Sequence, residues 1–234
     1  MSTPLVIRDR NTMRNLILTN QTMGRRIGFV PTMGSLHAGH TSLVDRAMAE
    51  CDDVVTSIFV NPNQFGPQED FEQYARDFDA DFNLLAQHDI RWIFAPDVHE
   101  MYPPDDSTRI EISGPAEPYE GQLRPGHFSG VATIVFRLLQ STPANTVYFG
   151  AKDWQQVLVV RQMVRDLGLD VEVMTCPIVR DKDGLALSSR NAYLSESERT
   201  RAQTMYAALQ QAEENWCRGL AIDKIELKVR DMLS

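Results

Sequence analysis

The chain has 234 residues, which is enough for one large domain or for one domain with a small appendage. Its 43% hydrophobic and 24% charged residues exclude a disordered or membrane-embedded class, and its net charge of −9 argues against binding nucleic acid or an anionic membrane. The cysteines, Cys51, Cys176 and Cys217, are widely spaced and odd in number, so neither a disulfide framework nor a cysteine metal site is predicted. Without an apolar run of signal-peptide or membrane-helix length, we expect a soluble cytoplasmic protein.

Helices and strands are predicted to alternate along most of the chain. The predicted helices are 11–23, 41–51, 69–87, 128–140 and 154–167, and the predicted strands are 27–30, 54–60, 91–95, 146–149 and 171–174. The helix at 69–87 rests on the helical spacing of Phe71, Tyr74, Phe78, Phe82 and Leu85. This alternation predicts an α/β fold with a Rossmann-like parallel sheet covered by helices on both faces.

The pattern changes near the C-terminus. Ser195 and Glu198 have the spacing of a capping box, and charge-rich helical sequence then runs to Ser234 with a break near Gly219. We therefore place a domain boundary near 188–194, with one domain at 1–187 and a small, mainly helical one at 188–234.

One segment has the composition of a phosphate-binding turn. Gly34 and Gly39 lie between a predicted strand and a predicted helix, where α/β sheets bind phosphate. The segment nearly matches a P-loop, but His40 replaces its lysine. His37 and His40 are three residues apart, so their imidazolium N–H groups could face one phosphate. A structural histidine pair beside a glycine turn explains this segment equally well.

Five segments in order resemble the pantothenate synthetase (pantoate–β-alanine ligase) family, within the nucleotidyltransferases that share a His-x-Gly-His element. They are Pro31-Thr32-Met33-Gly34 with His37-Ala38-Gly39-His40, Ser57-Ile58-Phe59-Val60-Asn61-Pro62-Asn63-Gln64-Phe65, Arg124-Pro125-Gly126-His127-Phe128, Phe149-Gly150-Ala151-Lys152-Asp153-Trp154-Gln155-Gln156, and Asp183-Gly184-Leu185-Ala186-Leu187-Ser188-Ser189-Arg190-Asn191. The resemblance covers roughly residues 5–199. It implies an ATP-dependent condensation of pantoate with β-alanine through a pantoyl adenylate, in a cytoplasmic homodimer.

The resemblance also implies roles for individual residues. His40, His37, Lys152 and Arg190 would be catalytic, with His40 the candidate proton donor. ATP would contact Met33, Gly34, Ser35, Leu36, His37, Ala38, Gly39, His40, Gly150, Ala151, Lys152, Asp153, Val179, Leu187, Ser188, Ser189 and Arg190. Gln64 and Gln156 would bind pantoate, with Gln64 also close to β-alanine; as neutral amides they can bind a carboxylate without repelling it. Taken singly, Lys152-Asp153 could be a solvated surface pair and Ser188-Ser189 an ordinary loop.

A magnesium contact and several departures complete the expectations. Asp81 matches an acidic position near the family's magnesium, and Asp77, one helical turn earlier, could help; a solvated helix face is the alternative. Asn63, Ala75, Ala151 and Ser129 stand where the family usually has methionine, proline, glutamate and arginine. Residues 1–187 would be the ATP- and pantoate-binding domain, and 188–234 a shortened C-terminal lid. Two alternatives stay open: another nucleotidyltransferase of this group, or a weakened relative that binds ATP or pantoate without efficient turnover.

Overall fold

A computed structural model describes residues 3–233 of the protein. It contains two compact units, which divide between Pro177 and Ile178. Each unit has its own secondary structure and its own packing, and each is described separately below. Among the described residues, no helix combines the length and the apolar character needed to span a bilayer.

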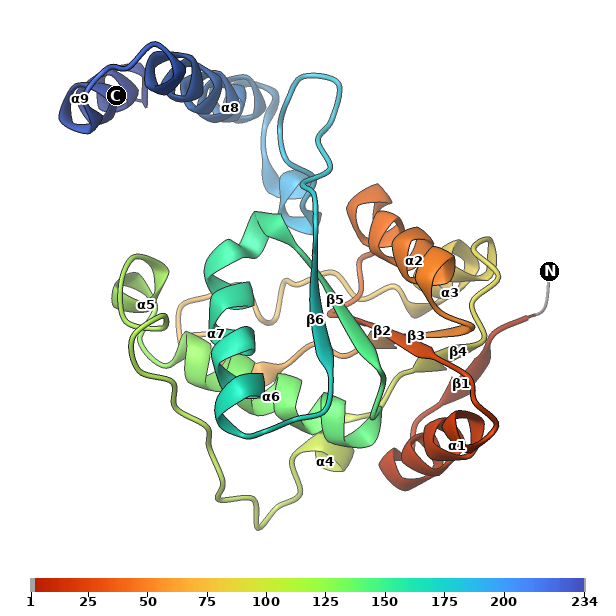
Figure 1. Ribbon diagram of the computed structural model, residues 1–234. Helices are drawn as coiled ribbons and strands as arrows, with labels where there is room; N and C mark the ends of the chain where they lie inside the picture. The colour runs from red at the N-terminus through yellow and green to blue at the C-terminus, as the bar shows by residue number, and fades with distance from the viewer. Residues whose placement is uncertain (1–2, 234) are drawn as a thin grey trace. The chain divides into compact units, whose positions relative to one another are not determined.

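The first unit is built on a six-stranded parallel sheet with the order β1-β4-β3-β2-β5-β6 (Figure 1). Its strands are β1 Leu5–Ile7, β2 Ile27–Thr32, β3 Asp53–Ile58, β4 Trp92–Phe94, β5 Thr146–Gly150 and β6 Glu172–Cys176. Its helices are α1 Arg10–Thr22, α2 Ala38–Glu50, α3 Phe78–Ala86, α4 Val98–Met101, α5 Glu120–Leu123, α6 His127–Ser141 and α7 Trp154–Asp166, with 3₁₀ turns η1 Pro62–Gln64 and η2 Ala151–Asp153. This architecture confirms the predicted α/β class.

Both faces of the sheet are buried, because successive side chains of a strand point to opposite faces. On one face, Phe29 of β2 packs in a cluster with residues of α1, α6 and α7. On the other face, the adjacent Val30 packs with residues of α2 and α3. Central parallel strands must be apolar on both sides, which explains why the runs at 27–30 and 54–60 were recognisable as buried strands.

The order in which successive strands are added to the sheet reverses between the neighbouring strands β2 and β5. β3 and β4 extend from β2 toward one edge, whereas β5 and β6 lie on its other side. The paired residues of β2 and β5 are Gly28 with Thr146 and Phe29 with Val147, near the start of both strands. Ligands of open α/β sheets bind at such a switch point, outside the carboxyl ends of the strands.

The predicted helix at 69–87 is wrong in its first half. α3 begins only at Phe78, where the Asp77 side chain accepts the N–H of Ala80 and caps the helix. The aromatic residues before it pack in a turn instead, with Phe71 and Tyr74 both edge-on to Phe65. Strand β1 was not predicted, because its three residues are too few to show an alternating or continuous apolar pattern. The remaining predicted elements are present with ends shifted by a few residues.

The second unit contains η3 Ser189–Tyr193, α8 Glu196–Cys217 and α9 Ile222–Leu233. The predicted capping box is present at the start of α8, between Ser195 and Glu198. Segment 178–187 belongs to this unit, which sets the division ten residues before the expected boundary. The physical reason is local packing: Arg199 of α8 pairs with Asp181 and Asp183 at 2.6 and 2.8 Å.

Candidate active site

A cavity of about 170 Å³ lies at the switch point, at the carboxyl ends of β2 and β5. Residues from both strand-to-helix connections line it, together with η1 and α7. The lining residues that were predicted to bind substrates are Met33, His40, Gln64, Gly150, Asp153 and Gln156. The fold therefore places the two predicted pantoate ligands and part of the predicted ATP site around one cavity.

The remaining wall of this cavity is largely apolar. It is formed by Pro31, Leu43, Phe59, Tyr74, Val131, Ile134, Val135, Leu138, Tyr148 and Phe149, with Thr32 and Asn61 as the further polar residues. None of the described residues that line the cavity is an arginine or a lysine. An apolar pocket with a few amide and imidazole groups and the Asp153 carboxylate suits a small, partly apolar molecule that is oriented by hydrogen bonds.

The connection between β2 and α2 is held by a buried carboxylate. Asp81 of α3 is only 4% exposed, and its oxygens accept the N–H groups of Ser35 at 2.9 Å and Leu36 at 2.7 Å. Burial raises the pKa of Asp81, and these two bonds partly offset that rise. Gly34 has φ of +82°, and a Cβ there would lie 2.8 Å from Asp81 Oδ2, so this position requires glycine. The Asp81 carboxylate therefore fixes the turn that precedes His37.

The two histidines share a defined tautomer. His37 caps α2, its Nδ1 accepting the N–H of Gly39 at 3.1 Å, and His40 Nδ1 accepts the N–H of His37 at 3.3 Å. Each ring therefore carries its proton on Nε2, which is left as a donor. The ring centroids are 4.1 Å apart. Two donors of this kind at the N-terminus of a 13-residue helix form a suitable environment for an anion.

The charge state of these rings differs from the expected imidazolium. Burial, followed by the neighbouring His37 and Lys152, lowers the pKa of His40 to about 3. Burial and Lys152 also lower the pKa of His37. Both rings are consequently neutral at pH 7 and act through neutral Nε2–H groups, an arrangement that polarises an oxygen without adding a fixed positive charge.

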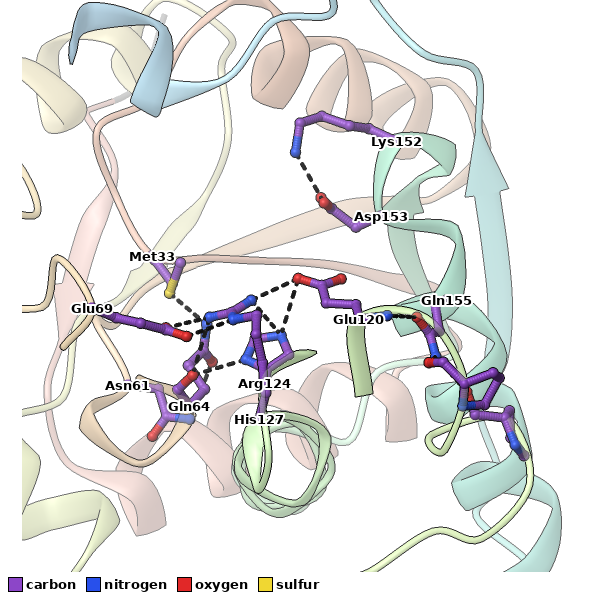
Figure 2. A network of polar contacts seen from close by, with 12 residues as sticks. Met33, Asn61, Gln64, Glu69, Glu120, Arg124, His127, Lys152, Asp153 and Gln155 are labelled. Carbon is purple, nitrogen blue, oxygen red and sulfur yellow. Dashed lines mark hydrogen bonds and ion pairs between the residues drawn. The ribbon is translucent and has the colours of Figure 1, made fainter. Parts of the chain in front are cut away.

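Lys152 and Asp153 belong to η2, and Asp153 lines the cavity. Lys152 is exposed on η2, and its Nζ is 2.9 Å from Asp153 Oδ1 (Figure 2). Ala151, beside them, is half-buried. Lys152 contributes, after burial, to the lowered pKa of both histidines, while its exposed ion pair with Asp153 also fits the solvated surface pair considered above.

Gln64 is fixed by both its side chain and its main chain. Its Nε2 donates to Met33 Sδ at 2.9 Å, and its Oε1 accepts from Asn61 Nδ2 at 3.1 Å. Asn61 is 1% exposed and also contacts Tyr102 Oη, at 2.8 Å, and the carbonyl of Gly130, at 3.2 Å. Asn61 was quoted in the motif but given no role, although an asparagine before a proline is a recognisable cap signal.

A charged network that was not predicted lies next to Gln64 (Figure 2). Arg124 pairs with both oxygens of Glu69, at 2.7 and 2.5 Å, and with Glu120 at 2.7 Å. His127 contacts Arg124 through Nε2 at 3.0 Å and the Gln64 carbonyl through Nδ1 at 2.8 Å. Arg124 and His127 belong to a recognised motif. Glu120 begins α5 and lies four residues before Arg124, a helical spacing that could have indicated their pairing, whereas Glu69 lies in a loop without a sequence signal for it.

The other predicted ATP contacts belong to the second unit. Leu187 donates its N–H to the Val179 carbonyl at 2.9 Å, next to a bridge between Arg180 and Ala186. The Ser188 side chain accepts the N–H of Arg190 at 3.3 Å and caps η3, which begins at Ser189. These residues form a turn that presents hydroxyl and guanidinium groups from one short segment.

The predicted metal position is occupied by protein contacts. Both oxygens of Asp81 accept main-chain N–H groups, and Asp77 caps α3. Within residues 3–233, no group of three or more histidine, cysteine, aspartate or glutamate side chains could hold a metal ion. A Mg²⁺ ion would therefore have to take most of its ligands from phosphate and water.

Comparisons with known proteins agree with the resemblance. The model of the family described as pantoate-beta-alanine ligase matches residues 5–234. A pantothenate synthetase from Thermotoga neapolitana is 54% identical over 195 residues, which are 83% of this chain and 70% of the relative. The pantothenate synthetase structure from Thermus thermophilus has a TM-score of 0.93 and 46% identity, covering 97% of this chain and 81% of its own. A pantoate-beta-alanine ligase from Francisella tularensis, complexed with beta-gamma ATP and beta-alanine, has a TM-score of 0.86 and 36% identity, covering 98% of this chain and 86% of its own.

Proposed function

This chain belongs to the pantoate-beta-alanine ligase family, and from that premise we propose how its residues divide the work of the reaction. The chain is a ligase that condenses pantoate with β-alanine and uses ATP as a substrate. A pantoate carboxylate oxygen attacks the α-phosphorus of ATP, pyrophosphate leaves, and pantoyl adenylate forms. The β-alanine amine then attacks the acyl carbon, loses a proton and displaces AMP, which yields pantothenate.

The single observation that supports the residue assignment is the shared cavity. Gln64 and Gln156 line it from separate elements, together with Met33 and His40. In our proposal the two amides orient pantoate, and the apolar wall holds its carbon skeleton away from water. The lack of arginine and lysine among the described lining residues argues against a nucleotidyltransferase with a phosphate as acceptor, which would need cationic groups.

In the same proposal, ATP takes its contacts from the two predicted phosphate segments and from the second unit. Segment 33–40 offers the N-terminus of α2 and the neutral Nε2–H groups of His37 and His40 to developing charge. Segment 150–153 adds Lys152 and Asp153 for phosphate and ribose. Val179 would contact adenine, and 187–190 the triphosphate.

Mg²⁺ is proposed as the ion that accompanies the nucleotide. It would neutralise phosphate charge and bring the attacking carboxylate closer to the α-phosphorus. The expected contact from Asp81 stays a prediction, since its oxygens already accept two N–H groups. A homodimer in the cytoplasm is the proposed setting. Sedimentation analysis would contradict the dimer if it returned the 26.5 kDa mass of one chain.

Pyrophosphate release tests the reaction and its substrate. Release from Mg-ATP should require pantoate, and AMP should appear in proportion to pantothenate once β-alanine is added. We expect Gln156→Ala to raise the KM for pantoate roughly tenfold or more, because a ligand carboxylate loses a hydrogen bond. Gln162→Ala is the control: it lies on the same helix, where its amide bonds to Asp166. Pyrophosphate release without pantoate would overturn the proposal, whereas ATP binding without AMP formation would favour the weakened relative.

A further inference from the structure

We propose that His127 is a positioning residue that holds the Gln64 segment in place for the acid substrate. His127 is the first residue of α6 and is 9% exposed. Its Nδ1 lies 2.8 Å from the carbonyl oxygen of Gln64. The proposal rests on the proposed function, because it takes Gln64 as a ligand of pantoate.

The direction of this contact follows from the neighbouring charge. Arg124 Nη1 lies 3.0 Å from His127 Nε2, and a guanidinium can only donate. Nε2 is therefore the acceptor, and the ring proton is on Nδ1, where it is donated to Gln64. The burial of the ring, which lowers its pKa, is consistent with a neutral imidazole that carries one proton.

Arg124 is itself held in a fixed orientation. Glu69 accepts two of its N–H groups and Glu120 a third, so the guanidinium points one donor at His127 (Figure 2). Bidentate pairing of this kind restricts both distance and angle. Two carboxylates, one guanidinium and one imidazole thus connect the loop after β3 to the start of α6.

The Gln64 segment needs such support because its own structure is slight. η1 has three residues, and the hydrogen bonds of a 3₁₀ turn have poorer geometry than those of an α-helix. The side chain of Gln64 is restrained by Met33 and Asn61, whereas its carbonyl is restrained by His127 and, at 3.4 Å, by Arg124. His127 makes the shorter of the two contacts, so it should decide where the Gln64 backbone lies.

Two substitutions of His127 separate its two ring nitrogens. The amide of His127→Asn can donate near the position of Nδ1, whereas that of His127→Gln reaches the position of Nε2. We expect His127→Gln to raise the KM for pantoate roughly five- to twentyfold, the change for one lost hydrogen bond, with the KM for ATP within twofold of wild type. His127→Asn should stay within threefold of wild type in both constants. Both are measured in the full chain, alongside thermal unfolding.

Gln64→Ala distinguishes failure of this inference from failure of the proposed function. If Gln64→Ala leaves the KM for pantoate unchanged, the assignment of Gln64 fails and this inference fails with it. If Gln64→Ala raises that KM but His127→Gln does not, the inference alone is overturned. It is also overturned if both His127 variants lose stability and change the two KM values equally, because that result describes a purely structural histidine.

Discussion

At the scale of single residues, this site depends on groups whose charge is set by burial. His37 and His40 would be expected to carry partial positive charge near neutral pH if they were exposed. Their half-buried position beside Lys152 keeps them neutral, and main-chain N–H groups keep their protons on Nε2. The sequence could predict that these residues face a phosphate, but it could not supply their charge, because charge depends on neighbours that only the fold brings near.

The neutrality of His40 should be visible in the pH dependence of stability. Its pKa is about 3 in the folded chain and about 6.5 when unfolded, so the unfolded chain binds the extra proton first. The related stability is complete above pH 6.5 and is lost as the pH falls toward 3. Between pH 7.5 and 5.0, wild type should lose about 1–2 kcal/mol more unfolding free energy than His40→Gln in urea titrations. Parallel losses in both proteins would contradict the assigned pKa.

Asp81→Asn should weaken the ATP site through the turn that Asp81 holds. An amide offers one oxygen and places an NH₂ group against a second backbone N–H, so one hydrogen bond is lost and two donors face each other. We expect a loss of about 1–3 kcal/mol in unfolding free energy and a raised KM for ATP.

The Mg²⁺ requirement discriminates between the two possible roles of Asp81. If Asp81 acts only on the metal, its variant should keep wild-type stability without nucleotide and should need more Mg²⁺ for half-maximal activity. Asp79→Asn is the control, because Asp79 is exposed on the same helix.

At the scale of elements, the close approach of η1 to α6 is the feature most sensitive to substitution. A Cβ at Gly130 would lie 2.2 Å from the Asn63 carbonyl oxygen and 2.8 Å from Gln64 Cα. Both are backbone atoms, so the helix and the turn would have to separate. Gly130 also accepts a hydrogen bond from Asn61, which would be lost with the same movement.

Gly130→Ala should therefore reduce both stability and pantoate affinity. The usual gain of about 1 kcal/mol for alanine in a helix is outweighed by an overpacking cost of typically 1–3 kcal/mol, and Gln64 moves away from the cavity. Thermal unfolding and the KM for pantoate measure the two effects. Ser129→Ala, on the same helix, should leave both nearly unchanged. A Gly130→Ala protein of wild-type stability and KM would show that the contact is not tight.

The elements that could be predicted are those with a complete local signal. The strand at 54–60 is β-branched and apolar, and the start of α8 carries its own capping box. The helix at 69–87 failed because Phe71 and Tyr74 have helical spacing but pack against Phe65 instead. Tertiary packing of aromatic rings overrode a periodic pattern there. Asp77 was considered as a magnesium contact or as part of a solvated helix face, and its role as the cap of α3 was not predicted.

At the scale of the whole molecule, the site combines segments that the sequence could name with contacts that it could not. Gln64 and Gln156 were predicted from ordered motifs, and the fold places both at one cavity. Glu69 was missed because its pairing with Arg124 depends on how its loop approaches α5, whereas Glu120 was overlooked although it lies one helical turn before Arg124. A contact between two segments that are far apart in the chain leaves no pattern in the sequence, whereas a motif between a strand and the following helix is contiguous and can be recognised.

The second unit should contribute to ATP use but not to pantoate binding. Every described residue that lines the cavity with Gln64 and Gln156 lies in the first unit, whereas Arg190 lies in the second. If Arg190 stabilises charge on the triphosphate, Arg190→Met should lower kcat/KM for ATP by roughly 10²–10³, the usual cost of one transition-state donor. Pantoate affinity, measured by calorimetry without nucleotide, should not change. Arg201→Met is the matched control, since Arg201 is an exposed arginine of the same unit. Equal losses of ATP use and pantoate binding would mean that Arg190 maintains the fold, because a contact made only to the triphosphate cannot alter the affinity for an acid bound alone.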